Sequence, residues 1–273
     1  MKLVEFSNGK KVLPLCINLH RSPDRKHSVQ EQMDAVGFPI NFSEGVDRLC
    51  MTDESGNPLP LKRVMFRGGD LSDALVDRIK IKYKRPEDGQ EEIYDYIPPR
   101  EVISKYQPYV TEMYPGLIGS QCAHQKCFKK FKDSDADFAF IMEDDIGLVT
   151  TKSGHLHARL EPLLSEQFDF CLVGKGFHRD YAPAQNGYSN NHIYETAYQY
   201  YSGASGYILS RAGVEKIHKM LPNYNTVFSG IDEFFGLCQI DFGFRILAVR
   251  DKFFGLKDDV LLTTMCDHKQ VVP

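Results

Sequence analysis

The sequence predicts an α/β fold with a mixed central sheet flanked by helices. Three observations indicate this class: short apolar runs of strand length recur along the chain, helical apolar spacing separates them, and glycine, proline or serine stands at the junctions. The chain has 273 residues, of which 42% are hydrophobic and 26% charged. This composition is globular, and the length suffices for one large domain or two small ones.

The first predicted elements form a βαβ unit. Residues 12–19 (VLPLCINL) are a continuous apolar run, which is typical of a strand buried on both faces of a sheet. Ser22 and Pro23 then supply a helix cap and a first-turn proline, and apolar residues recur at helical spacing as far as Gly37. Residues 38–42 predict the next strand. A strand, a helix and a strand in this order suit a short sheet with parallel pairing.

Residues 51–110 differ from their flanks. Glycine, proline and charged residues become more frequent there, and apolar periodicity weakens. We therefore expect this segment to be an insertion rather than part of the core. Within it, residues 71–83 partly satisfy both the helical and the strand period, so the type of element stays open.

Regular patterns return at Gly116. An apolar stripe predicts a helix from there to about Asp133, and residues 137–142 predict a short apolar strand. Later elements follow the same alternation: a helix near residues 155–166, a strand at 168–173, a helix capped by Ser210 up to Leu221, a helix capped by Ser229 up to about Gln239, and a strand at 244–249.

Charge and hydropathy argue against whole classes of partner. The formal charge of −4 gives no global electrostatic reason to expect nucleic acid or a membrane surface. Residues 1–19 hold too short an apolar segment for a signal peptide, and no run of eighteen apolar residues occurs. The seven cysteines lack any C-x-x-C spacing and lie mostly in apolar runs. We expect a cytoplasmic protein with buried free thiols.

Three acids, Glu143-Asp144-Asp145, directly follow the predicted strand at residues 137–142. In open α/β sheets, ligands bind beyond the carboxyl ends of the strands, so these acids stand where a ligand would bind. Carboxylate oxygens suit Mg²⁺ or Mn²⁺, which take further ligands from substrate phosphates. From these residues alone, an anchor for a metal and a nucleotide is no better an interpretation than an acidic loop that caps the next segment.

The flanking sequence favours the anchor. Residues 17–25 (INLHRSPDR) end an apolar strand and continue with spaced arginines, residues 116–124 (GLIGSQCAH) precede the three acids, and residues 202–213 (SGASGYILSRAG) follow them. In order and approximate spacing, these segments resemble glycosyltransferase family 25, which contains the lipopolysaccharide and collagen galactosyltransferases. Ala123 departs from the serine that the family usually has before the histidine, and residues 51–110 match no part of the family pattern.

The resemblance implies one catalytic domain over residues 1–273 with a GT-A (Rossmann-like) fold. It further implies a divalent cation, Mn²⁺ or Mg²⁺, a nucleotide-sugar donor with UDP-galactose as the default, and inversion at the anomeric carbon. The acceptor would be a glycan hydroxyl, as in lipopolysaccharide core. We expect the insertion at residues 51–110 to lie on the acceptor side.

Sugar transfer places negative charge on the departing diphosphate and needs a base for the acceptor hydroxyl. Asp145, with Glu143 or Asp144, would hold the metal. The resemblance favours Asp145 as the metal ligand and Asp144 as the residue that reaches the ribose or donor sugar. His268 can complete such a site, although a terminal Asp-His pair is more often a solvated tail. The full set predicted to bind the donor is Asn18, Arg21, Arg25, Glu143, Asp144, Gly203 and Ala204.

Asp232 and Glu233 are the candidates for the base, because both follow a glycine at the start of a predicted helix, and Asp232 is preferred to Glu233. Acids in a first helical turn could equally complement the helix dipole. Arg21 and Arg25, four residues apart, could reach the diphosphate or form surface salt bridges with Asp24 and Glu31. His124, alone in a helix, is more often a packing residue than a catalytic one.

Two alternatives remain open. Basic runs, at Arg78, Lys80, Lys82, Lys84 and Arg85 and at Lys126, Lys129, Lys130 and Lys132, could accept a polyanion. The same chemistry would then act on a hydroxymethylated base in DNA, and the DNA phosphates would dominate binding. The other alternative is a non-catalytic module that binds nucleotide sugars or glycans.

Overall fold

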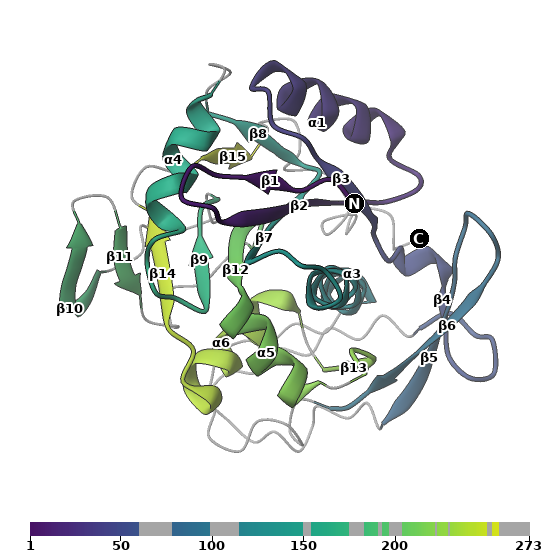
Figure 1. Ribbon diagram of the computed structural model, residues 1–273. Helices are drawn as coiled ribbons and strands as arrows, with labels where there is room; N and C mark the ends of the chain where they lie inside the picture. Colours follow the sequence, from purple (N-terminus) through teal and green to yellow (C-terminus); the bar gives the residue numbers. More distant parts are fainter. Residues whose placement is uncertain are drawn as a thin grey trace.

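The centre of the fold is a mixed sheet with helices on both faces, as Figure 1 shows. The computed structural model describes residues 1–59, 78–98, 115–149, 154–174, 183–190, 193–196, 204–221, 223–228, 230–249 and 253–256. Within these ranges the sheet follows the order β1-β2-β7-β12-β9-β14-β11-β10, with β3 also paired to β2. The predicted α/β class with a mixed central sheet is confirmed.

The strands of this sheet have the following bounds: β1 Val4–Glu5, β2 Lys11–Asn18, β3 Asn41–Glu44, β7 Phe138–Glu143, β12 Gly206–Ser210, β9 Phe170–Leu172, β14 Ile246–Val249, β11 Ile193–Thr196 and β10 Pro183–Asn190. Strand β2 pairs in parallel with both β3 and β7, which confirms the opening βαβ unit. Strand β12 runs antiparallel between β7 and β9, and β14 is parallel to β9. The carboxyl ends of β2, β3, β7, β9 and β14 therefore lie at one edge of the sheet.

Two layers of helices cover the sheet (Figure 1). Helices α1 (Pro23–Ala35) and α4 (His155–Leu163) pack on one face, and α3 (Pro115–Lys132), α5 (Arg211–Met220) and α6 (Ile231–Phe242) pack on the other. The strand period of two divides β7 between these layers: Ala139 and Ile141 belong to the cluster of α3, whereas Phe140 and Met142 belong to the cluster of α1. This alternation determines where the acids after β7 point.

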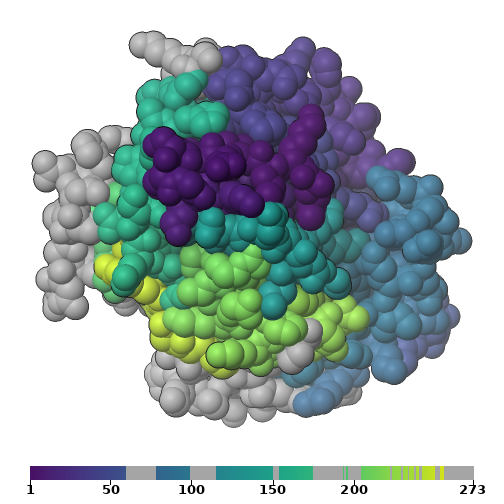
Figure 2. Space-filling view, viewed as in Figure 1, coloured from purple at the N-terminus to yellow at the C-terminus, as the bar shows by residue number. Residues whose placement is uncertain are grey.

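A second, four-stranded sheet contains part of residues 51–110. Its order is β13-β6-β5-β4, with β4 at Met51–Thr52, β5 at Ile79–Lys84, β6 at Glu91–Tyr96 and β13 at Thr226–Val227. Figure 2 shows the blue residues of β5 and β6 gathered on one flank of the molecule.

The sequence left residues 71–83 open between helix and strand, and the described part, from Ile79, is strand β5. The expectation that the segment lies outside the core is wrong for Ile81, Tyr83, Tyr94 and Tyr96, which are buried in the same cluster as α3. In the paired strands β5 and β6, every second side chain is buried and the charged side chains between them face solvent. A search for the helical period of 3.6 residues therefore does not detect the buried residues.

Two small elements complete the described structure. Strand β8 (Ile146–Leu148) pairs with β15 (Phe254–Leu256), and a short 3₁₀ helix, η1, spans Arg48–Cys50. None of the described helices is long and apolar enough to cross a membrane.

Helix caps show where local patterns are reliable. Ser210 caps α5 as predicted, because its Oγ accepts a hydrogen bond from Gly213 N at 3.0 Å. Ser22 occupies the N-cap position of α1 without a side-chain hydrogen bond. The prediction for α6 was one residue early, since its N-cap is Gly230, whose backbone is extended; Ser229 lies outside the described residues.

The described cysteines are free thiols, as predicted. Those at positions 16, 122, 127, 171 and 238 are buried, whereas Cys50 is half-buried. Cys266 lies outside the described residues.

Candidate active site at the carboxyl edge of the sheet

Two separate segments bring acidic side chains to the carboxyl edge of the sheet, and the start of β12 lies beside them. Glu143 is the last residue of β7, and Asp144 and Asp145 follow it. Because β12 is antiparallel, its first residue Gly206 lies opposite Met142 at the same edge. Helix α6 leads into β14, which runs in the direction of β7, so the first turn of α6 with Asp232 also lies there. We call Glu143, Asp144, Asp145 and Asp232 the acidic edge.

Asp144 points to the α1 side of the sheet and is held by two side chains. Asn18, the last residue of β2, donates from Nδ2 to Asp144 Oδ2 at 2.6 Å. Arg25 of α1 donates from Nη1 to Asp144 Oδ1 at 3.2 Å. The buried carboxylate is therefore paired with a cation and hydrogen-bonded, and this pairing aims the Arg25 guanidinium at this edge.

Asp145 has the opposite environment. Its Oδ1 is buried and has no hydrogen-bond partner among the described residues. Burial, and then the carboxylates of Glu143 and Asp144, raise the pKa of Asp145 to about 7, although Arg25 acts in the other direction. A buried carboxylate oxygen without a donor is costly unless another cation satisfies it. This oxygen fits a divalent cation, because hard cations prefer carboxylate ligands.

Glu143 points to the other side of the sheet, toward α3 and α6. Burial raises the pKa of Glu143 to about 8, with further contributions from Asp232 and Asp144. Its Oε1 lies 3.4 Å from Nε2 of His124, and Nδ1 of His124 lies 2.6 Å from the hydroxyl of Tyr207. The sequence favoured a packing role for His124 and gave no role to Tyr207, since only the register of α3 against β7 and β12 brings them to the acids.

Asp232 stands in the first turn of α6, half-buried. Its Oδ1 accepts a hydrogen bond from the backbone N–H of Ala204 at 2.9 Å, so two residues predicted for the site from distant segments are in contact. The side chain of Glu233 and the whole of Gly203 lie outside the described residues.

Arg21 does not join Arg25 at the acidic edge. Helix α1 begins at Pro23, so Arg21 lies in the preceding turn and the two arginines do not share a helical face. Arg21 Nε instead donates to Asp47 Oδ2 at 2.6 Å, and neither the acidic edge nor the predicted surface partners Asp24 and Glu31 receives this bond.

No group of three or more histidine, cysteine, aspartate or glutamate side chains within the described ranges is arranged to hold a metal ion. Consecutive residues at a strand end point to opposite faces, which separates Glu143 from Asp144. The predicted ligand His268 lies outside the described residues, so the set of Asp145, Asp144 and His268 stays a prediction.

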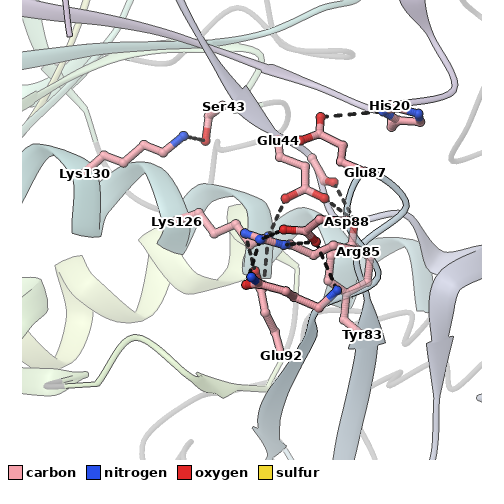
Figure 3. Close-up of polar contacts among 12 residues, drawn as sticks. His20, Ser43, Glu44, Tyr83, Arg85, Glu87, Asp88, Glu92, Lys126 and Lys130 are labelled. Atoms are coloured by element: carbon pink, nitrogen blue, oxygen red, sulfur yellow. Dashed lines mark hydrogen bonds and ion pairs between the residues drawn. The ribbon is translucent and has the colours of Figure 1, made fainter.

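A second group of charged residues lies between β3, α3 and the β5–β6 hairpin, and Figure 3 shows it in close-up. Lys126 Nζ lies 3.2 Å from Glu44 Oε2 and 2.9 Å from Glu92 Oε2. Arg85 Nε donates to Asp88 Oδ1 at 3.0 Å within the hairpin turn. We call Glu44, Arg85, Asp88, Glu92 and Lys126 the hairpin cluster. It joins the second sheet to the main sheet by paired charges.

In the part of the chain that the structure describes, the lysines of the two basic runs contact other side chains or backbone, or lie opposite acids. In β5, Lys80 and Lys84 lie directly opposite Asp95 and Glu91 of β6. The lysines of the other run, on α3, contact acids or a hydroxyl: Lys126 contacts Glu44 and Glu92, Lys129 contacts Asp133, Lys130 contacts Ser43 and Lys132 contacts Glu215. These contacts offset the positive charge that a polyanionic acceptor would need.

A comparison with known families gives a match that spans the acidic edge. A family model described as "Glycosyltransferase family 25 (LPS biosynthesis protein)" matches residues 13–235, a range that contains all four residues of the acidic edge. No curated protein matches the chain significantly. The mixed sheet with flanking helices is consistent with a Rossmann-like glycosyltransferase fold. The chain therefore belongs to glycosyltransferase family 25 and is an enzyme that transfers a sugar from a donor to an acceptor.

Proposed function

We propose that this enzyme is an inverting, divalent-cation-dependent hexosyltransferase. Its donor would be a UDP-hexose, UDP-galactose by family resemblance, and its acceptor a hydroxyl of a glycan such as lipopolysaccharide core. The single observation that carries the proposal is that Oδ1 of Asp145 is buried at the carboxyl edge of the sheet and has no hydrogen-bond partner among the described residues.

The residues around Asp145 suit a diphosphate held through a cation. Asp145 would ligate Mn²⁺ or Mg²⁺, which when bound would neutralise charge on the leaving diphosphate. Arg25, anchored by Asp144, lies close enough to lower the pKa of both Asp145 and Glu143. Its guanidinium can meet phosphate oxygens in a planar, bidentate geometry.

Asp232 is the proposed base. An inverting transfer needs a carboxylate on the side of the sugar opposite the leaving group. The acceptor oxygen forms a bond to the anomeric carbon as the bond to the diphosphate oxygen breaks, and the hydroxyl proton passes to Asp232. The hydrogen bond from the backbone N–H of Ala204 to Asp232 Oδ1 supports this role, because it fixes the orientation of the carboxylate.

A nucleotide-sugar panel with Mn²⁺, scored by sugar hydrolysis and by thermal shift, tests the proposal without a known acceptor. We expect UDP-hexoses to be hydrolysed slowly and to raise the melting temperature only when the cation is present. Hydrolysis that is equally fast in EDTA would contradict the cation, and hydrolysis of another nucleotide's sugars alone would contradict UDP. Neither hydrolysis nor shift with any donor would contradict the proposed function as a whole.

A DNA base is not proposed as the acceptor. That alternative depended on free positive charge in the two basic runs, and the described lysines of these runs have acidic, hydroxyl or carbonyl partners or lie opposite acids.

A further inference from the structure

A buried histidine and tyrosine stand behind the acidic edge. His124 of α3 and Tyr207 of β12 are both fully buried, and their rings stack with centroids 5.5 Å apart. His124 is bonded at both nitrogens: Nδ1 lies 2.6 Å from the Tyr207 hydroxyl, and Nε2 lies 3.4 Å from Glu143 Oε1. A chain of polar contacts thus runs from the core to one carboxylate of the site.

The environment determines the charge of this imidazole. Burial lowers the pKa of His124 to about 3, although Asp232 acts in the other direction. A neutral imidazole carries a single N–H, so one ring nitrogen donates and the other accepts. If the Tyr207 hydroxyl donates to Nδ1, the ring proton is on Nε2 and is directed at the Glu143 carboxylate.

Glu143 lies at the open edge of the sheet, where its side chain is 23% exposed. A partly exposed glutamate can adopt rotamers that turn its carboxylate out into solvent. The hydrogen bond from His124 opposes this rotation.

We propose that His124 and Tyr207 are positioning residues for the donor site: Tyr207 donates to Nδ1 of His124, and His124 donates its Nε2–H to Glu143 and so fixes the orientation of that carboxylate. This inference rests on the proposed function, because it gives Glu143 a part in donor binding. It adds two residues whose effect on the donor passes through Glu143.

Packing alone would not require this pair. An apolar side chain could fill the space between Phe128 and Tyr207 without the cost of burying an imidazole. The hydroxyl of Tyr207 would likewise serve no purpose in an apolar core. Because both positions carry polar groups, and His124 contacts Glu143, an orienting role accounts for them better.

Kinetic variants test the proposal. His124→Leu removes the donor and should raise the KM for the donor about 10- to 100-fold, with the KM for the acceptor unchanged. His124→Gln keeps an N–H donor near the place of Nε2 and should restore much of the donor affinity. Tyr207→Phe removes a single oxygen and should raise the donor KM by less than His124→Leu.

Tyr94→Phe is the matched control. Tyr94 is also buried and its hydroxyl also bonds a carboxylate, Glu92 Oε2 at 2.7 Å, but that carboxylate belongs to the second sheet. We expect an unchanged donor KM in this variant. A variant that is merely destabilised lowers the active fraction, and so the apparent kcat, but leaves both KM values as in the wild type.

The outcomes separate the two claims. If the wild type turns over UDP-sugars but His124→Leu and Tyr207→Phe leave the donor KM unchanged, the positioning role is wrong and the pair is a packing feature. If the wild type turns over no nucleotide sugar, the proposed function fails first. In that case ¹⁵N spectra of labelled histidine, assigned with His124→Gln, still decide: the proton of His124 should be on Nε2, and a proton on Nδ1 would overturn the proposal.

Discussion

The acidic edge and the hairpin cluster are both groups of charged side chains at the ends of strands, but they differ in charge balance. In the hairpin cluster, Lys126 lies between two glutamates and Arg85 bonds Asp88. At the acidic edge, three consecutive carboxylates lie around the guanidinium of Arg25, and Asp145 Oδ1 has no hydrogen-bond partner within the described ranges. In the hairpin cluster the charges balance one another, whereas at the acidic edge the proposed cation would supply the missing positive charge.

We interpret this difference as a sign that the hairpin cluster stabilises the fold, whereas the acidic edge is the proposed ligand site. Folding offsets the desolvation of charges by pairing them, as in the hairpin cluster. Unpaired, buried acids weaken the fold and persist where a ligand supplies the missing charge. Helix α3 serves both clusters, since His124 contacts Glu143 and Lys126 contacts Glu44. Substitutions in the acidic edge should therefore lower activity, and substitutions in the hairpin cluster should lower stability.

The largest expected effect comes from Asp145→Asn. The variant keeps the shape of the side chain but removes the charge that would hold the cation, so Mn²⁺-dependent turnover of UDP-sugar should fall about 100-fold or more. Asp88→Asn is the matched control in the hairpin cluster, where Asp88 is partly exposed and bonds Arg85; we expect turnover close to wild type. Full activity in Asp145→Asn would contradict the role of Asp145 as a ligand of the cation.

Asp232→Asn should have the next largest effect on turnover. Loss of a general base lowers kcat by about 100- to 10,000-fold while donor binding is retained, because the base acts on the acceptor in the transition state. Turnover would be measured with a glycan acceptor, and donor affinity by thermal shift with UDP and Mn²⁺. Retained turnover together with lost donor affinity would make Asp232 a binding residue instead.

Gly119→Ala tests how closely α3 must approach both clusters. A Cβ at this position would lie 2.5 Å from the carbonyl oxygen of Val46, so helix or loop must shift. We expect a loss of about 1–3 kcal/mol in the free energy of unfolding, measured with urea. Gly116→Ala on the same helix meets only Arg48 Cδ at 3.8 Å among close neighbours, and it should be neutral or slightly stabilising. Equal losses in both variants would argue against the close contact as the cause.

Lys126→Met should change stability alone. Removing this charge leaves the carboxylates of Glu44 and Glu92 without their shared partner, at a cost of about 1–3 kcal/mol in the free energy of unfolding. The KM for the donor should stay at the wild-type value in the same preparation. A raised donor KM would show that the hairpin cluster takes part in donor binding and is not purely structural.

Helices and strands could be predicted from the sequence where the spacing of apolar residues alone determines the type of element. The buried run of β2, the helix after Pro23 and the strand before Glu143 depend on local apolar patterns, and all three form as expected. The second sheet could not be predicted in this way. Its buried residues, such as Ile81 and Tyr94, alternate with charges, and their place in the core depends on pairing between distant strands.

In the candidate site too, local patterns predicted individual residues but not the contacts between distant segments. Its acids were predicted because they follow an apolar strand, and Asn18 because it ends another strand. That Asn18 donates to Asp144 depends on the pairing of β2 with β7, across 126 residues of sequence. Arg21 was misplaced because the helix starts two residues after it, and the contact of His124 with Glu143 depends on helix packing, which no local pattern encodes.

Direct Mn²⁺ binding tests the central claim, that Asp145 of the acidic edge holds a cation and that the paired acids of the hairpin cluster do not. Electron paramagnetic resonance of free Mn²⁺, titrated with protein in the presence of UDP, would be compared among the wild type, Asp145→Asn and Asp88→Asn. We predict one bound Mn²⁺ per chain in the wild type and in Asp88→Asn, and none at the same concentrations in Asp145→Asn. Equal binding by all three proteins, or loss in Asp88→Asn alone, would contradict the account.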